Sequence, residues 1–176
     1  MITNYLRIAA WSIPPVLLLI PLIAMRFTDE VVWTLSDFVF MAGLLFGTGI
    51  ALELAMRTGH SAAYRAGAVV AIGTSFFLVW INAAAGFIGG ENNDANMMYP
   101  YAVAIGIFGA VAVKFRPMGM AYVLVCAALM QVAIPIIALI ASMVTVDTKA
   151  CVLTAGFTAL WLCAAGLFRK SAAKPK

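Results

Sequence analysis

Three polar side chains interrupt the long apolar stretches of this sequence: Asp37, Asn82 and Gln131. A carboxylate at the centre of a membrane costs about 2.5–3.5 kcal/mol, so it usually faces a polar partner or a wet cavity. An amide in the same setting either contacts a solute or hydrogen-bonds to a neighbouring helix, generally for less than about 2 kcal/mol. The three residues are therefore the candidate substrate-binding residues, and hydrogen bonding between helices is the alternative for each.

The spacing of these residues suggests how they would be arranged. Asp37 is expected about 9 Å below the outer boundary of its apolar stretch, and Asn82 is expected at a similar depth in the next one. A hairpin of the two stretches would bring the acid and the amide together in an outward-facing polar site. Gln131 lies one turn before Pro135. Its side chain could bond to the carbonyl freed by that proline, to another helix, or to a solute.

Other residues whose types could take part in catalysis or metal binding have simpler explanations. Glu53 precedes Arg57 by one helical turn, which favours an ion pair at a helix end over a gating role. His60, the only histidine, has no second metal ligand nearby and is interpreted as a loop residue rather than a metal or proton-transfer site. The three cysteines form no CxxC, and no nucleotide-binding, zinc-protease or serine-hydrolase motif occurs.

We expect no catalytic residue, no cofactor and no metal. A lipid-modifying enzyme that uses Asp37 or Glu53 is a remote alternative, because no base–nucleophile set is visible.

The elements that must position these residues are apolar helices. The chain is 65% hydrophobic and 10% charged, with a mean hydropathy of +1.05. A hydrocarbon core of about 30 Å needs roughly 20 apolar residues of helix, and a backbone in lipid must satisfy its own hydrogen bonds. The sequence predicts an all-α, polytopic transmembrane bundle of six spans in a single domain, residues 1–170, followed by a basic tail, residues 171–176. The spans are expected at Ile8–Met25, Val31–Met56, Tyr64–Ile88, Met97–Val113, Gly119–Val144 and Cys151–Phe168.

The charges predict the orientation, with both termini inside. Of the 11 basic residues only Arg26 and Lys149 would then lie outside, which agrees with the positive-inside rule. The loop acids would face out, and the basic tail would lie against anionic headgroups. Membrane lipid is therefore the expected partner. Nucleic acid is not, because no folded surface exists to display the basic residues.

Two further patterns bear on the loops and the packing. The polar segment 89–96 is predicted to be an outer turn in which Gly89 and Gly90 end the third span and Asp94 or Asn96 caps the next helix. Cation binding through its oxygens is the alternative. Small residues favour close helix packing, either within the bundle or between subunits. They recur four residues apart in Gly43-xxx-Gly47-xxx-Ala51, Ala63-xxx-Gly67-xxx-Ala71 and Ala155-xxx-Ala159-xxx-Cys163.

One segment carries a resemblance. The stretch from Trp80 to Met120 contains Gly-Gly-Glu-Asn-Asn-Asp-Ala-Asn-Met-Met-Tyr at 89–99. It resembles a segment of a family of small bacterial polytopic inner-membrane proteins. The resemblance implies a multi-pass protein of the bacterial inner (cytoplasmic) membrane, and it carries over no catalytic or binding residue. In length and number of spans the chain is also similar to the substrate-binding subunits of energy-coupling-factor transporters, although it has no vitamin-binding motif.

Two functions are compatible with these observations. The first is transport or permeation of a small solute or ion by a homo-oligomer, in which Asp37 and Asn82 form the outward-facing site and Gln131 lies further along the path. The second is a non-catalytic accessory or scaffold subunit of a larger membrane protein complex. The short loops, the small-residue faces and the lack of a chemical motif are compatible with the second.

Overall fold

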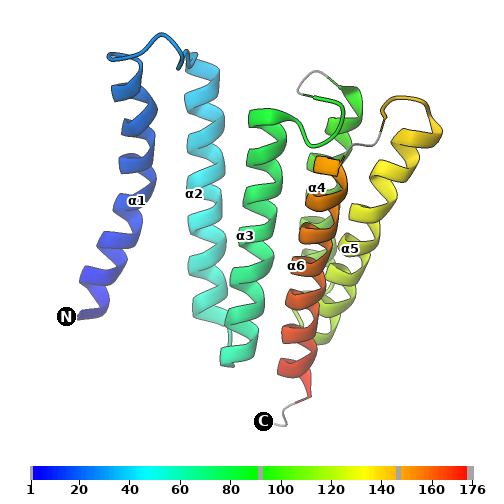
Figure 1. Ribbon diagram of the computed structural model, residues 1–176. Helices are drawn as coiled ribbons and strands as arrows, with labels where there is room; N and C mark the ends of the chain where they lie inside the picture. Colours follow the sequence, from blue (N-terminus) through cyan, green and yellow to red (C-terminus); the bar gives the residue numbers. More distant parts are fainter. Residues whose placement is uncertain (1, 91–92, 146–147, 174–176) are drawn as a thin grey trace. The chain divides into compact units, whose positions relative to one another are not determined.

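The computed structural model describes residues 2–90, 93–145 and 148–173, with the side chains of residues 2–8 left out. The described residues form six α-helices and one short 3-10 helix (Figure 1). These are α1 (Ile2–Ala24), α2 (Leu35–Thr58), α3 (Ala62–Ala85), η1 (Asp94–Met97), α4 (Met98–Ala112), α5 (Pro117–Ile140) and α6 (Thr148–Ala172). The predicted all-α class is confirmed.

Five helical segments are long and apolar enough to cross a membrane. They are Leu35–Thr58, Ala62–Ala85, Asp94–Ala112, Pro117–Ile140 and Thr148–Ala172. In α1, the part with described side chains, Ala9–Ala24, is apolar but shorter. By length and composition, the helices are compatible with a multi-pass membrane protein. The sixth crossing and the inward orientation of both termini stay predictions.

The helix ends differ from the predicted spans by a few residues. Local capping residues, glycine and proline explain the observed ends. The second helix begins at Leu35, four residues later than expected, because Thr34 acts as its N-cap by accepting from the Asp37 N–H. The third ends at Ala85, since Gly86 adopts a φ of 62° that ends the helix. The turn thus comes before Gly89 and Gly90, and the prediction that these two glycines end the helix is wrong. The fifth begins at Pro117, because a proline fits the first turn of a helix.

The chain divides into two compact units, Met1–Leu54 and Ala55–Lys176. In the first unit the Trp11 ring stacks on Phe46, with ring centroids 6.3 Å apart. The same indole lies 3.6 Å from the point where a Cβ on Gly49 would sit, an ordinary van der Waals distance, so Trp11 also lies beside Gly49 of α2. The predicted single domain over residues 1–170 stays a prediction.

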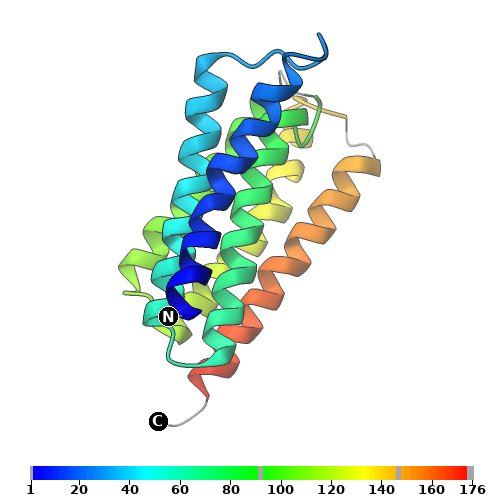
Figure 2. The ribbon, with the colours of Figure 1, turned by 90° about the vertical axis from the view of Figure 1, so that its left-hand side faces the viewer.

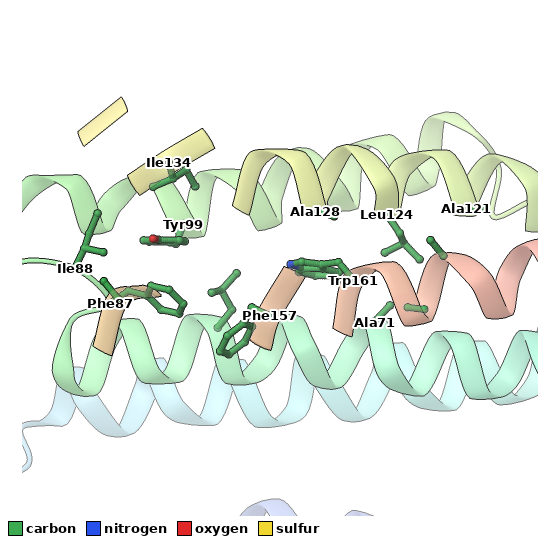
Figure 3. Packing of buried hydrophobic residues seen from close by; sticks show 14 of the residues in the cluster. Ala71, Phe87, Ile88, Tyr99, Ala121, Leu124, Ala128, Ile134, Phe157 and Trp161 are labelled. Carbon is green, nitrogen blue, oxygen red and sulfur yellow. The ribbon is translucent and has the colours of Figure 1, made fainter. Parts of the chain in front are cut away.

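In the second unit four helices contact one another in a ring. α6 contacts α3 and α5, and α4 contacts the same two helices. Large apolar side chains fill the interior, and small ones such as Ala121 and Ala128 let the helices approach (Figure 3). Many large apolar side chains point outward instead, as Phe108 and Leu129 do. An apolar exterior is compatible with lipid, whose tails are as apolar as a leucine side chain.

α3 and α6 approach closely near the C-terminal end of the chain. Figure 2 shows α6 inclined to α3, with the two helices meeting at that end. A Cβ on Gly67 would lie 3.0 Å from the Phe168 ring, and the Tyr64 ring meets Phe168 edge-on with centroids 4.9 Å apart. The small-residue face of α3 therefore packs within the chain, on α6.

Candidate functional site

Asp37 lies in the first turn of α2, where it forms a capping box with Thr34. Its Oδ2 accepts from the Thr34 backbone N–H at 2.7 Å and from the Thr34 hydroxyl at 2.8 Å. The Asp37 N–H donates back to that hydroxyl at 3.4 Å. These bonds satisfy groups that a helix start leaves without partners, and the negative charge suits the positive end of the helix dipole. Asp37 is exposed and has a structural role in the first unit. Its predicted contact with a solute stays a prediction.

The connection after α3 folds back into the second unit. Phe87 and Ile88 are only 1% and 2% exposed, and both are held by Asn96. The Asn96 Oδ1 accepts from the N–H of Phe87 at 2.8 Å and of Ile88 at 3.0 Å, while its Nδ2 donates to the carbonyl of Gly90. A buried donor without a partner costs about 1–3 kcal/mol. One amide side chain therefore stabilises the whole turn.

Asn93 caps η1, and α4 follows Met97 without a side-chain cap, so the prediction that Asp94 or Asn96 caps the next helix is wrong. The Asn93 Oδ1 accepts from the N–H of Ala95 at 2.9 Å. Its Nδ2 donates to the carbonyl of Met143 at 2.8 Å, which joins this turn to the segment that follows α5. The alternative of a cation site in this turn involves residues 91–92, which lie outside the described residues. Among the residues that are described, no three His, Cys, Asp or Glu side chains come together as metal ligands.

Asn82 lies in the last turn of α3. Its Nδ2 donates to the main-chain oxygen of Asn96 at 2.9 Å, so it joins α3 to η1. Its Oδ1 is buried and makes no hydrogen bond within the described structure. Asn82 thus makes a hydrogen bond between helices, as the sequence allowed, and its Oδ1 remains available as an acceptor.

Three further polar atoms are buried without a hydrogen-bond partner. They belong to Tyr99 on α4, which is 0% exposed, to Gln131 on α5, which is 2% exposed, and to Thr154 on α6. The atoms are the Tyr99 hydroxyl, the Gln131 Nε2 and the Thr154 Oγ1. Together with Asn82 these residues are called the buried polar set below. The set brings hydroxyl, amide-donor and amide-acceptor groups into the four-helix unit.

Contacts around Tyr99 join it to Thr154, another member of the set, and to the turn after α3. The Tyr99 and Thr154 side chains interact, although neither hydroxyl completes a hydrogen bond. The Phe87 ring packs on Tyr99 with centroids 4.4 Å apart. Figure 3 shows the Tyr99 ring between Phe87 and Ile134, and Gln131 lies one helical turn before Ile134 on α5. The buried end of the α3–η1 turn therefore packs directly on a member of the set.

The structure places two of the three predicted residues, Asn82 and Gln131, in the second unit, and Asp37 in the first. Sequence reasoning missed Tyr99 and Thr154. A hydroxyl in a membrane helix commonly bonds to a carbonyl of its own helix, so the residue type alone carries little signal.

Two other threonines show that default behaviour. Thr74 donates to Val70 and Thr158 donates to Thr154, each at 2.7 Å. The Thr154 hydroxyl does not, and only the structure reveals the difference.

The members of the set are all uncharged, and they offer both donors and acceptors. In native proteins a buried polar group without a protein partner commonly bonds to water or to a bound molecule. These buried groups are therefore candidates for hydrogen bonds to water or to a small polar molecule, in an interior otherwise filled by apolar side chains.

Comparison of this chain with protein-family models, with curated proteins and with solved structures gives no match.

Proposed function

We propose that this chain transports or conducts a small polar solute across a bacterial inner membrane, as a homo-oligomer. The observation that supports this most is the burial of Gln131 and Tyr99, whose Nε2 and hydroxyl, respectively, complete no hydrogen bond within the described structure. Burying such a group without a hydrogen bond costs at least about 1–3 kcal/mol. A cost of this size is offset where a polar molecule binds. The assignment to a membrane rests on the five apolar helices. The assignment to a bacterial inner membrane rests on the resemblance of residues 80–120 to a family of bacterial inner-membrane proteins.

The chemistry of the site favours an uncharged solute over an ion. The buried polar side chains of the described chain are Thr74, Asn96 and Gln131, none of which is charged. A bare cation needs several oxygen ligands, and a charge inside a membrane needs a counter-charge or a wet path. Hydroxyls and amides instead match a hydroxyl- or amide-bearing molecule. In this proposal Asn82, Gln131 and Thr154 contact the solute, and Asp37 lies at the outward-facing entry.

Flux through reconstituted liposomes tests the proposal. Wild-type protein should accelerate the entry of urea or glycerol, followed by light scattering. Thr154→Val and Gln131→Leu should slow that entry about tenfold, the equivalent of one lost hydrogen bond of about 1.4 kcal/mol. Thr158→Val is the matched control, because the hydroxyl of Thr158 already donates within its own helix.

The outcomes separate the two parts of the proposal. Entry of neutral solutes no faster than in protein-free liposomes would contradict transport. Passage of potassium or chloride without urea or glycerol would leave transport standing and contradict the uncharged solute.

The alternative is a non-catalytic accessory or scaffold subunit of a larger membrane protein complex. α2 favours it, because none of its side chains is buried. Within the first unit, nothing lies within 4 Å of a Cβ added at Gly43 or Gly47. Small-residue faces of this kind let another helix approach closely. A second protein retained at a fixed ratio after mild extraction would favour this alternative over a homo-oligomer.

A further inference from the structure

Cationic side chains gather at one end of the second unit. They come from three segments: the first turn of α3, the turn between α4 and α5, and the last turn of α6. All of them are exposed, and together they are called the cationic end: Arg65, Lys114, Arg116, Arg169 and Lys170.

Specific contacts hold these three segments together. The hydroxyls of Ser61 and Ser171 share a hydrogen bond of 2.7 Å, which joins the start of α3 to the end of α6. The Tyr64 hydroxyl donates to the carbonyl of Phe115 at 3.1 Å, which joins α3 to the α4–α5 turn. The edge-on contact of Tyr64 with Phe168 reinforces the first of these links. Every residue of the cationic end is next in sequence to one of these contact residues, so the charges are brought together by the fold.

The α4–α5 turn displays its charges in an unusual backbone conformation. Lys114 and Phe115 have φ values of 53° and 54°, a region that L-residues other than glycine seldom adopt. The hydrogen bond from Tyr64 holds this turn in place. Next to the cations, Phe115 and Met118 expose apolar side chains at 52% and 44%. The turn therefore presents positive charge and apolar surface side by side.

The positive charge has little to balance it within the second unit. Among the described residues of that unit, Asp94 is the one acid, and it belongs to η1, at the other ends of α3 and α4. One cationic donor is partly used, since the Arg65 Nε donates to the carbonyl of Gly59 at 3.0 Å. A guanidinium has five N–H groups, so further donors are left for a ligand.

We propose that the cationic end binds the phosphate headgroup of an anionic phospholipid. Arginine and lysine are the side chains that pair best with phosphate oxygens. Basic residues beside a membrane span attract anionic lipid, and exposed apolar side chains at the same place contact acyl chains. Phe115 and Met118 therefore favour a lipid over free phosphate as the source of the anion. The inference is independent of the proposed transport function, because it involves no member of the buried polar set.

Native mass spectrometry of the full chain in detergent tests this. Phosphatidylglycerol should remain bound at concentrations about tenfold lower than phosphatidylcholine. The double variant Lys114→Gln/Arg116→Gln should abolish that difference, and the pair Arg169→Gln/Lys170→Gln should reduce it. Arg26→Gln removes a positive charge outside the second unit and should leave it unchanged. Lys114→Arg, which keeps the charge, should also bind normally.

Two results would overturn the inference. Equal retention of the two lipids by the wild-type protein would show that the cationic end does not recognise the headgroup charge. Inorganic phosphate that displaces phosphatidylglycerol at equal concentration would show a site for the free anion rather than for a lipid. Circular dichroism of each variant in the same detergent checks that the helices are intact.

Discussion

At the residue scale, single amide side chains organise the turn that closes the second unit. The Asn96 side chain satisfies two buried N–H groups and one carbonyl, and its main-chain oxygen accepts from Asn82. The Asn93 side chain likewise acts as both acceptor and donor: it caps η1 and donates to the carbonyl of Met143, after α5. An amide side chain carries its donor and its acceptor on separate atoms and has no charge, which suits asparagine to this role in an apolar setting.

Two substitutions at Asp37 separate its cap from its proposed contact with solute. Asp37→Ala removes the capping bonds from Thr34 and should lower the free energy of unfolding by about 1 kcal/mol, measured by unfolding in mixed micelles. Asp37→Asn keeps an acceptor and removes the charge, so it should cost less stability. If the acid also receives solute, this second variant abolishes liposome flux. Asp29→Ala is the control for charge alone, and an equal loss of stability there would contradict the capping role.

At the scale of elements, the contact of α3 with α6 depends on the absence of a side chain at Gly67. A Cβ there would lie 3.0 Å from Phe168 and 3.2 Å from Leu167. Close packing leaves little room for adjustment, because both rows of side chains belong to buried helix faces. The pattern Ala63-xxx-Gly67-xxx-Ala71 thus packs within one chain, one of the two uses that such a pattern allows.

Gly67→Ala should therefore destabilise the protein by about 1–3 kcal/mol through overpacking. Gly73→Ala is the matched control on the same helix, because nothing lies within 4 Å of its added Cβ. That change should be neutral or stabilising by up to about 1 kcal/mol, since alanine favours helix. Thermal unfolding of both variants in one detergent makes the comparison. Equal effects at the two positions would show that the close approach of α3 to α6 contributes nothing to stability.

At the scale of the whole molecule, charge predicts the orientation of the spans. Helix length and hydropathy do not distinguish the two sides of the membrane. The insertion machinery does, because it responds to lysine and arginine in short loops. The cationic end of the second unit and the positions of Arg26 and Lys149 belong to this pattern. Both termini are therefore expected inside the cell.

Thiol labelling in intact cells checks that orientation. In a background with Cys126, Cys151 and Cys163 replaced by alanine, a membrane-impermeant maleimide should label Thr28→Cys from outside. His60→Cys should react only after the membrane is permeabilised. Labelling of both positions in intact cells would contradict the six-span topology with both ends inside.

The sequence alone was enough to determine the class of protein and the approximate helices. Apolar runs and loop charges are local properties, and a membrane responds to them one segment at a time. Helix ends were less predictable, because single caps such as Thr34 and Gly86 move them by several residues. Asn82 and Gln131 could be selected as candidates for the site because amides are rare in apolar runs.

Tertiary structure decided which polar groups are paired. The sequence does not show that Thr158 bonds within its helix while Thr154 does not, or that Tyr99 is fully buried. It also does not show that Asn96 serves as the centre of a turn. These properties depend on which faces of α3, α4, α5 and α6 meet. Those faces are determined by packing between residues that are distant in sequence. Local composition therefore does not predict them.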